Sequence, residues 1–129
     1  MKKTFTKEER LCSKRKIDSL FHSGSSFIVY PFRVVYFASP SQENLYPVQV
    51  ILSVSKRRFK HAHDRNRIKR LIREVYRLQK NELLYEEANK LSLNLDMAIQ
   101  YVGKEELGFE LLFAKMNKTL KQLVHAISA

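Results

Sequence analysis

Basic side chains recur along residues 56–80 at a spacing that suits contact with phosphate groups. This segment holds eleven Lys and Arg residues and two acidic ones, in a chain whose net charge is +11. Arginine dominates, and its planar guanidinium grips phosphate oxygens through two parallel hydrogen bonds. The candidate phosphate ligands are Lys56, Arg57, Arg58, Arg65, Asn66, Arg67, Lys69, Arg70, Arg73 and Arg77. Such an excess of positive charge predicts a polyanionic partner, because the charges repel one another in the folded chain when no anion neutralises them.

A helix that begins near Asp64 is predicted to position most of these side chains. With about 100° between successive residues, one stripe of this helix is apolar and holds Ile68, Leu71, Ile72, Val75 and Leu78. The opposite stripe holds Asn66, Lys69, Arg70, Arg73, Arg77 and Lys80. A charged stripe is often only a solvated face, but one of nearly a single sign favours binding. We therefore predict a contiguous electropositive ridge that faces outward from Arg65 through Arg77.

A basic amphipathic helix can also lie on a membrane or enter a calmodulin-like groove. The apolar stripe of this helix is short and lacks Trp and Phe. It is also needed to cover the sheet that the flanking strands would form. We therefore expect a core role for the apolar stripe and no membrane partner.

The residues before the basic segment predict one helix and two strands. Ser13 is a suitable cap for a helix over residues 14–22, and Gly24 supplies its stop. Residues 32–38 are rich in β-branched and aromatic types, and they are expected to form a hairpin with the next extended run. That run, residues 48–55, alternates with period two, which predicts a central strand.

The residues after the basic segment complete the predicted fold. A helical piece is expected over residues 82–91, a strand over 95–102, and a last helix from 104 or 105 to 127. The predicted element order is α-β-β-α-β-α. This order indicates an α+β chain, a two-layer α/β sandwich in which a small mixed sheet has helices on one face.

Composition limits the class of protein. The chain has 129 residues, of which 44% are hydrophobic, which suits a single domain over residues 1–129 with residues 1–10 as a basic, flexible arm. The start of the chain lacks the apolar core of a signal peptide, and no run approaches about 18 apolar residues. Cys12 is the only cysteine and cannot form an internal disulfide. A cytoplasmic protein is expected.

The parts of a self-sufficient enzyme are missing from the sequence. The histidines His22, His61, His63 and His125 are scattered, and the two closest ones lie among cations that disfavour metal binding. No paired carboxylates, phosphate-binding glycine loop or nucleophile elbow occurs. We therefore expect no catalytic residue, no metal ligand and no cofactor bound by the protein alone.

The segment LSVSKRRFKHAHDRNRIKRLIREVYRL resembles the protein component of bacterial ribonuclease P. The family signature is Arg-Asn-Arg followed by further basic residues on one helix. It stands here as Arg65, Asn66, Arg67, Lys69, Arg70 and Arg73, after the strand end SVSK. RLCSKRKIDSLFHSG and RVVY extend the resemblance over about residues 10–80.

The resemblance implies a subunit of the ribonucleoprotein that removes the 5′ leader from precursor tRNA. Its partners would be the catalytic RNA, which carries the chemistry with Mg²⁺ expected in the holoenzyme, and precursor tRNA. It also implies the ribosomal protein S5 domain 2-like fold with a left-handed βαβ crossover, against the usual right-handed preference. A ribosomal-type RNA-binding protein with no role in cleavage is the alternative, and both need the basic face.

The resemblance further implies a cleft between the sheet and the first helix that binds the single-stranded leader. Carried over by position, the cleft would be lined by Ile17, Phe21 and Tyr36, with Lys56 nearby. The family often has an aromatic residue where this chain has Ile17, so base stacking, worth about 1–3 kcal/mol per base, is not assured there. An ordinary core role is the alternative for Ile17 and Phe21.

Overall fold

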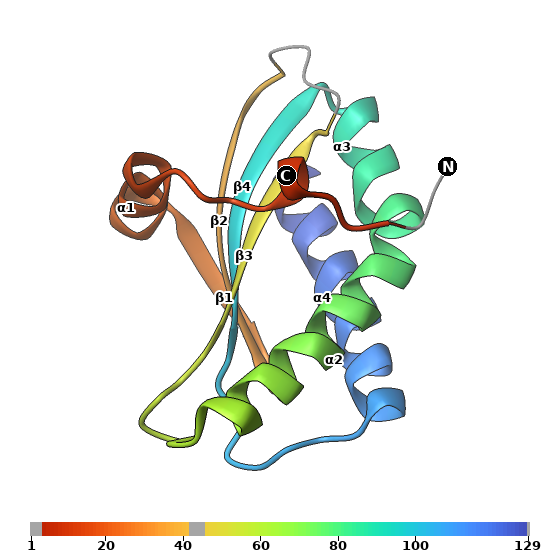
Figure 1. The fold of residues 1–129 in the computed structure, drawn as a ribbon. Coiled ribbons are helices and arrows are strands. Elements are labelled where there is room, and N and C mark those ends of the chain that lie inside the picture. The colour runs from red at the N-terminus through yellow and green to blue at the C-terminus, as the bar shows by residue number, and fades with distance from the viewer. Residues whose placement is uncertain (1–3, 42–45, 129) are drawn as a thin grey trace.

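The computed structural model describes residues 4–41 and 46–128, and its centre is a four-stranded mixed sheet (Figure 1). The strands are β1 (Ser25–Val29), β2 (Phe32–Pro40), β3 (Val48–Val54) and β4 (Leu93–Tyr101), in the order β1-β2-β4-β3. The helices are η1 (Lys7–Glu9), α1 (Lys14–Ser23), α2 (Ala62–Lys80), η2 (Asn81–Tyr85), α3 (Glu86–Lys90) and α4 (Phe109–Ser128). The predicted mixed sheet with helices is confirmed.

The main core lies between the sheet and helices α2 and α4. Ile72 and Val75 of α2 and Met116 of α4 are fully buried against strand residues such as Val34 and Ile99. These positions follow the predicted helical and strand periods, so the amphipathic patterns alone select this face.

A smaller core on the opposite face corrects the expectation that helices cover one face only. The helix α1 lies on this face (Figure 1), and its Leu20 packs with Leu11, Val35 and Ala98. Val35 and Ala98 are 3% and 1% exposed, so the middle of the sheet is buried on both faces. The helix α1 has the predicted cap, with the Ser13 side chain accepting from the Lys16 amide at 3.4 Å.

The strand pairing differs from the prediction. The predicted hairpin of residues 32–38 with 48–55 does not form, because β2 pairs antiparallel with β1 and β4. The strand β3, predicted to be central, lies at the edge and pairs parallel with β4. The physical reason is that α2 and α3 return the chain between these two strands. The crossover itself is therefore present, and its hand stays a prediction of the resemblance.

The strand β1 was not predicted, and it follows α1 after a single residue. A Cβ at Gly24 would lie 2.5 Å from the carbonyl oxygen of Leu20 and 2.9 Å from that of Tyr36. The turn from α1 into β1 therefore requires glycine at this position. Because β1 has only three apolar residues in five, its sequence pattern was too short to indicate a strand.

Residues 4–10 lie against β3 and α2 instead of extending as an arm, while residues 1–3 lie outside the described residues. Arg10 forms a parallel bridge with Val50, and the Leu11 amide donates to the Val50 carbonyl at 2.9 Å. The Glu9 carboxylate pairs with the Lys80 ammonium, and these side chains are 2% and 1% exposed. Lys80, predicted on the exposed stripe of α2, is therefore buried because the N-terminal segment covers it.

Candidate nucleic-acid interface

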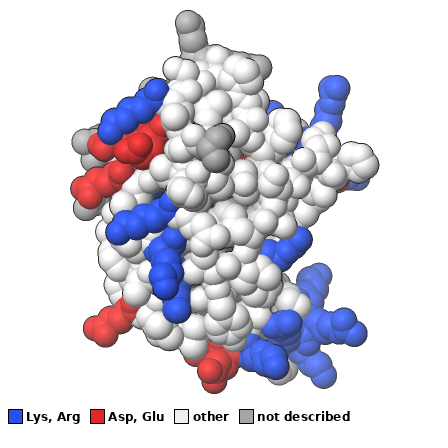
Figure 2. Space-filling view, turned by 180° about the vertical axis from the view of Figure 1, so that it is seen from behind, with Lys and Arg blue, Asp and Glu red and all other residues white. Residues whose placement is uncertain are grey.

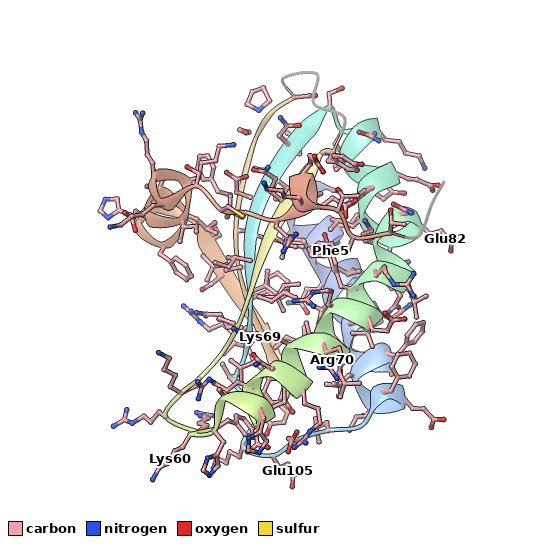
Figure 3. The ribbon with its side chains drawn as sticks, viewed as in Figure 1. Phe5, Lys60, Lys69, Arg70, Glu82 and Glu105 are labelled. Carbon is pink, nitrogen blue, oxygen red and sulfur yellow. The ribbon has the colours of Figure 1, made fainter. Side chains whose placement is uncertain are left out.

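Three basic residues in the middle of α2 form the centre of the site. Arg70 and Arg73 are exposed and Lys69 is partly exposed. Lys69 and Arg70 leave the helix on different sides, Lys69 on the side of β3 (Figure 3). Within the part of the chain that the structure describes, none of the three forms an ion pair. Their charges are therefore available to an external anion, and we call these three residues the free cation row.

The arginines on either side of this row are occupied by carboxylates of the same chain. Arg67 donates from Nε to Glu106 at 2.8 Å and from Nη2 to Asp64 at 2.8 Å. The bond with Glu106 raises the pKa of Arg67 and lowers the pKa of Glu106. Arg77 donates from Nη2 to Glu74 at 2.5 Å, which lowers the pKa of Glu74. The predicted contiguous ridge from Arg65 through Arg77 is therefore interrupted by these carboxylates.

Arg65 has a different environment, because its guanidinium holds the loop before α2. Its Nη1 donates to the Phe59 carbonyl at 2.8 Å and to the Lys60 carbonyl at 2.9 Å. Asn66, next in sequence, is exposed. The first arginine of the signature thus links α2 to the loop and keeps the two parts of the basic surface in one arrangement.

The loop between β3 and α2 carries the second part of the basic surface. Its exposed cations are Lys56, Arg57, Arg58 and Lys60. In Figure 2 the blue side chains gather at the lower right, where this loop lies, whereas red and blue mix along the opposite edge. Arg58 also donates from Nη1 to the Val102 carbonyl, which ties the loop to the end of β4. Charge is thus concentrated at one end of the molecule.

A groove runs beside the free cation row. It has a volume of about 370 Å³ and lies between the N-terminal segment, α1, the edge of β3 and α2. Its lining residues are Phe5, Arg10, Leu11, Cys12, Ile17, Val50, Ile51, Leu52, Lys69 and Arg73. The groove combines an apolar floor with three cations at its border. That combination suits a chain with apolar bases and an anionic backbone.

The predicted cleft residues are only partly brought together. Ile17 lines the groove and packs against the small core of α1, and Phe21 is 47% exposed, so an ordinary core role is excluded for Phe21. Tyr36 is a correction, because it faces the main core and its ring lies 6.0 Å from that of Phe27. The aromatic residue of β2 that lies on the side of α1 is Phe37.

Strand alternation could have located Phe37. Successive side chains of a strand point to opposite faces, so buried Phe32 and Val34 place Tyr36 on their own face and Phe37 on the other. The family resemblance, carried over by sequence position without regard to strand alternation, points to Tyr36 instead of Phe37.

The described residues hold neither a cluster of potential metal ligands nor a membrane-spanning helix. No three His, Cys, Asp or Glu side chains among them lie together as a potential metal site. None of the described helices is both long and apolar enough to cross a membrane.

The chain is similar to known proteins in both sequence and structure. A family model described as Ribonuclease P matches residues 5–124. The ribonuclease P protein component of Porphyromonas gingivalis is 37% identical over 115 residues, covering 89% of this chain and 82% of the relative. That of Chlorobium phaeobacteroides is 35% identical over 129 residues, covering 94% of this chain and 86% of the relative.

Solved structures share the fold. The RNase P protein from Thermotoga maritima aligns with a TM-score of 0.68 at 22% identity, covering 88% of this chain and 96% of that chain. The RNase P protein of Staphylococcus aureus aligns with a TM-score of 0.67 at 20% identity, covering 89% and 94%. At these identities the likeness concerns the fold alone.

Proposed function

This chain belongs to the ribonuclease P protein family, and we propose that its free cation row, Lys69, Arg70 and Arg73, binds the phosphate backbone of ribonuclease P RNA. The family makes it the protein subunit of an endoribonuclease that processes tRNA, in partnership with that RNA. The observation that carries the proposal is that these three cations lack ion pairs among the described residues, and that two of them, Lys69 and Arg73, border a groove. Surface cations without an internal partner can neutralise phosphates, and the release of counterions from the nucleic acid then favours binding.

The remaining basic residues are given graded roles. Lys56, Arg57 and Arg58 of the loop extend the phosphate-binding surface, and Asn66 supplies a neutral hydrogen-bonding group beside it. Arg67 and Arg77 share their charge with Glu106 and Glu74, so they contribute less to affinity. Arg65 orders the loop through its two backbone contacts and acts on RNA mainly by that route.

The groove beside α1 is proposed to hold the single-stranded 5′ leader of precursor tRNA. Ile17 provides apolar contact in the groove, and exposed Phe21 of the same helix provides a stacking surface for a base. Phe37, which lines the neighbouring hollow beside α1 and not the groove itself, replaces Tyr36 as the strand aromatic on this face of the sheet. An exposed aromatic side chain on a charged surface supports this role, because burial does not explain its position.

The RNA subunit is proposed to carry the chemistry of cleavage. Mg²⁺ would act at that RNA, since phosphate oxygens and water are the hard ligands that it prefers. The protein would then contribute binding and orientation of the precursor. Its cations are suited to that contribution, since they reduce the repulsion between two RNA backbones.

Reconstitution with the cognate ribonuclease P RNA tests the proposal. The variant Lys69→Ala/Arg70→Ala/Arg73→Ala is expected to lose most of the protein's stimulation of precursor tRNA cleavage at low Mg²⁺. The matched control is Lys115→Ala/Lys118→Ala/Lys121→Ala, which removes the same charge from α4 and is expected to keep stimulation. Equal loss in both variants would reduce the effect to net charge, and retained stimulation in the first variant would contradict the proposal.

A further inference from the structure

The sheet face that lies toward α1 carries three neighbouring side chains outside the groove. Asp96 of β4 lies directly between Phe37 of β2 and Gln49 of β3 in the strand register. The row below it, formed by Val35, Ala98 and Ile51, is covered by α1. This apolar row separates the Phe37–Asp96–Gln49 row from the open part of the sheet. Two members of the row, Phe37 and Asp96, line a separate hollow beside α1.

The hollow is open to solvent and contains the carboxylate of Asp96, which accepts no hydrogen bond from the described residues. It has a volume of about 450 Å³, within the range of small-ligand sites. Arg15 and Lys16 line it together with Phe37 and Asp96. Asp96 is partly buried, and none of the described residues donates a hydrogen bond to its carboxylate. A desolvated carboxylate with no donor costs free energy, so the site is suited to a ligand that brings its own N–H groups.

The neighbouring side chains narrow the class of ligand. The Phe37 ring is 46% exposed and lies beside Asp96, so a flat ring stacked on it would present its edge to the carboxylate. Lys16 forms no ion pair with Asp96, because its Nζ donates to the Gln49 amide oxygen at 3.4 Å, although its charge opposes the rise that burial causes in the pKa of Asp96. Lys16 and Arg15 are both exposed and can meet a phosphate. An aromatic face, an acceptor pair and two cations together match one nucleotide of single-stranded RNA.

The acceptor pair distinguishes among the four bases. Guanine presents two adjacent donors, N1–H and the N2 amine, to the two oxygens of one carboxylate. Adenine and cytosine each present one exocyclic amine beside a ring acceptor. Uracil presents a single N–H between two carbonyl oxygens, which a carboxylate repels. From this geometry we propose that Phe37 and Asp96 form a guanine-selective nucleotide subsite, with Asp96 as the specificity-determining residue.

The subsite rests on the proposed function, because the guanine would belong to the leader of a bound precursor tRNA. It is separate from the free cation row, which contacts phosphates without regard to base. Asp96 would therefore change which leader is preferred, while the α2 cations change how strongly any precursor binds.

The test uses the reconstituted holoenzyme and precursor tRNAs that differ by one leader nucleotide, placed in turn at each leader position. The wild type is expected to prefer guanine about tenfold at one position. Asp96→Asn is expected to abolish that preference, because an amide offers one acceptor instead of two, while affinity for leaderless substrate stays unchanged. Phe37→Leu is expected to weaken binding several-fold for all four bases at that position and to keep the guanine ratio.

Asp18→Asn provides the matched control, since it removes the same charge from an exposed position of α1. It is expected to keep the guanine preference. A wild type without base preference at any position, or a preference that survives Asp96→Asn, would overturn the subsite while leaving leader binding intact. If the wild-type holoenzyme bound leader-containing and leaderless substrates equally well, the proposed function would be overturned, and the subsite with it.

Discussion

The middle and the last turn of α2 place positive charge in opposite surroundings. Arg70 and Arg73 are exposed without an ion pair among the described residues, whereas Lys80 is 1% exposed and pairs with Glu9. All three residues belong to one amphipathic helix and share a basic sequence pattern. The difference comes from the N-terminal segment, which covers only the last turn. A basic residue of this helix is therefore a ligand for RNA or a structural element according to what covers it.

The surroundings of Lys80 explain how its charge is tolerated in the interior. Its ammonium lies 5.7 Å from the centre of the Phe5 ring and 4.9 Å from that of Tyr85. The Glu9 carboxylate also accepts from the Thr6 amide at 3.0 Å, so the carboxylate has more than one donor. Burial lowers the pKa of Lys80, and the pair with Glu9 opposes that shift. The pair fixes the N-terminal segment that forms one wall of the groove.

The largest expected effect is on stability, and it follows from substitution of the buried Lys80. Lys80→Ala leaves the Glu9 carboxylate buried and unpaired, so the free energy of unfolding should fall by about 3–5 kcal/mol. Arg73→Ala, an equal loss of charge at an exposed position, should change it by less than about 0.5 kcal/mol. Urea unfolding followed by circular dichroism measures both. Equal, small effects would mean that the Lys80–Glu9 pair holds nothing in place.

A double substitution sharpens the result. Glu9→Leu/Lys80→Met replaces both charges with apolar side chains, and such replacements are often neutral or stabilising by about 1–4 kcal/mol. The double variant should therefore recover most of the stability lost in Lys80→Ala. Failure to recover would indicate that the charges themselves, beyond their pairing, are required.

The sequence predicted the amphipathic core of α2 well, because Ile68, Ile72 and Val75 follow a period set by helix geometry. It could not predict the fate of Lys80, whose partner Glu9 lies 71 positions away in the chain. The same holds for Arg67 and Glu106, which are separated by 39 positions. Periodicity identifies which side chains share a face, whereas ion pairs depend on which distant segment meets that face.

The sheet shows the same limit. Alternation along residues 48–54 correctly indicated a strand with Val48, Val50 and Val54 buried. The position of that strand at the edge depends on pairing with β4, which lies about forty residues further along. The basic character of the candidate site could likewise be predicted from the local sequence. Which of its cations are paired with carboxylates could be known only from the folded structure.

The second-largest expected effect is on RNA affinity, and it concerns the exposed cations in the middle of α2. Arg70→Ala should reduce affinity for ribonuclease P RNA and lower the slope of log affinity against log salt by about 1, as expected for one lost phosphate contact. The control Arg67→Ala/Glu106→Gln removes a charge pair that is already neutral as a unit, so its slope should change less. Titration at several salt concentrations gives both slopes. A larger change in the control would show that Arg67 leaves Glu106 to bind RNA.

The smallest expected effect is a pH dependence of the surface pairs. The pKa of Glu106 is lowered from its ordinary value of 4.5, chiefly by its hydrogen bond with Arg67, and that of Glu74 is lowered by Arg77. A carboxyl group with a lowered folded pKa stabilises the fold above its unfolded pKa and loses this contribution as the pH falls through the folded value. Both pairs should therefore weaken only below pH 4.5, and the loss should be small because solvent screens exposed pairs.

Thermal unfolding between pH 6 and pH 3, a range of about three units around these groups, measures this contribution. Glu106→Gln removes the titrating group, so its melting temperature should start slightly lower than that of the wild type and fall less steeply with acid. Glu105→Gln removes an exposed neighbour that forms no ion pair among the described residues, and its profile should keep the wild-type steepness. Identical profiles for all three proteins would mean that Arg67 is not held by Glu106 in solution, and Asp64 would then be the carboxylate that limits the contribution of Arg67 to RNA binding.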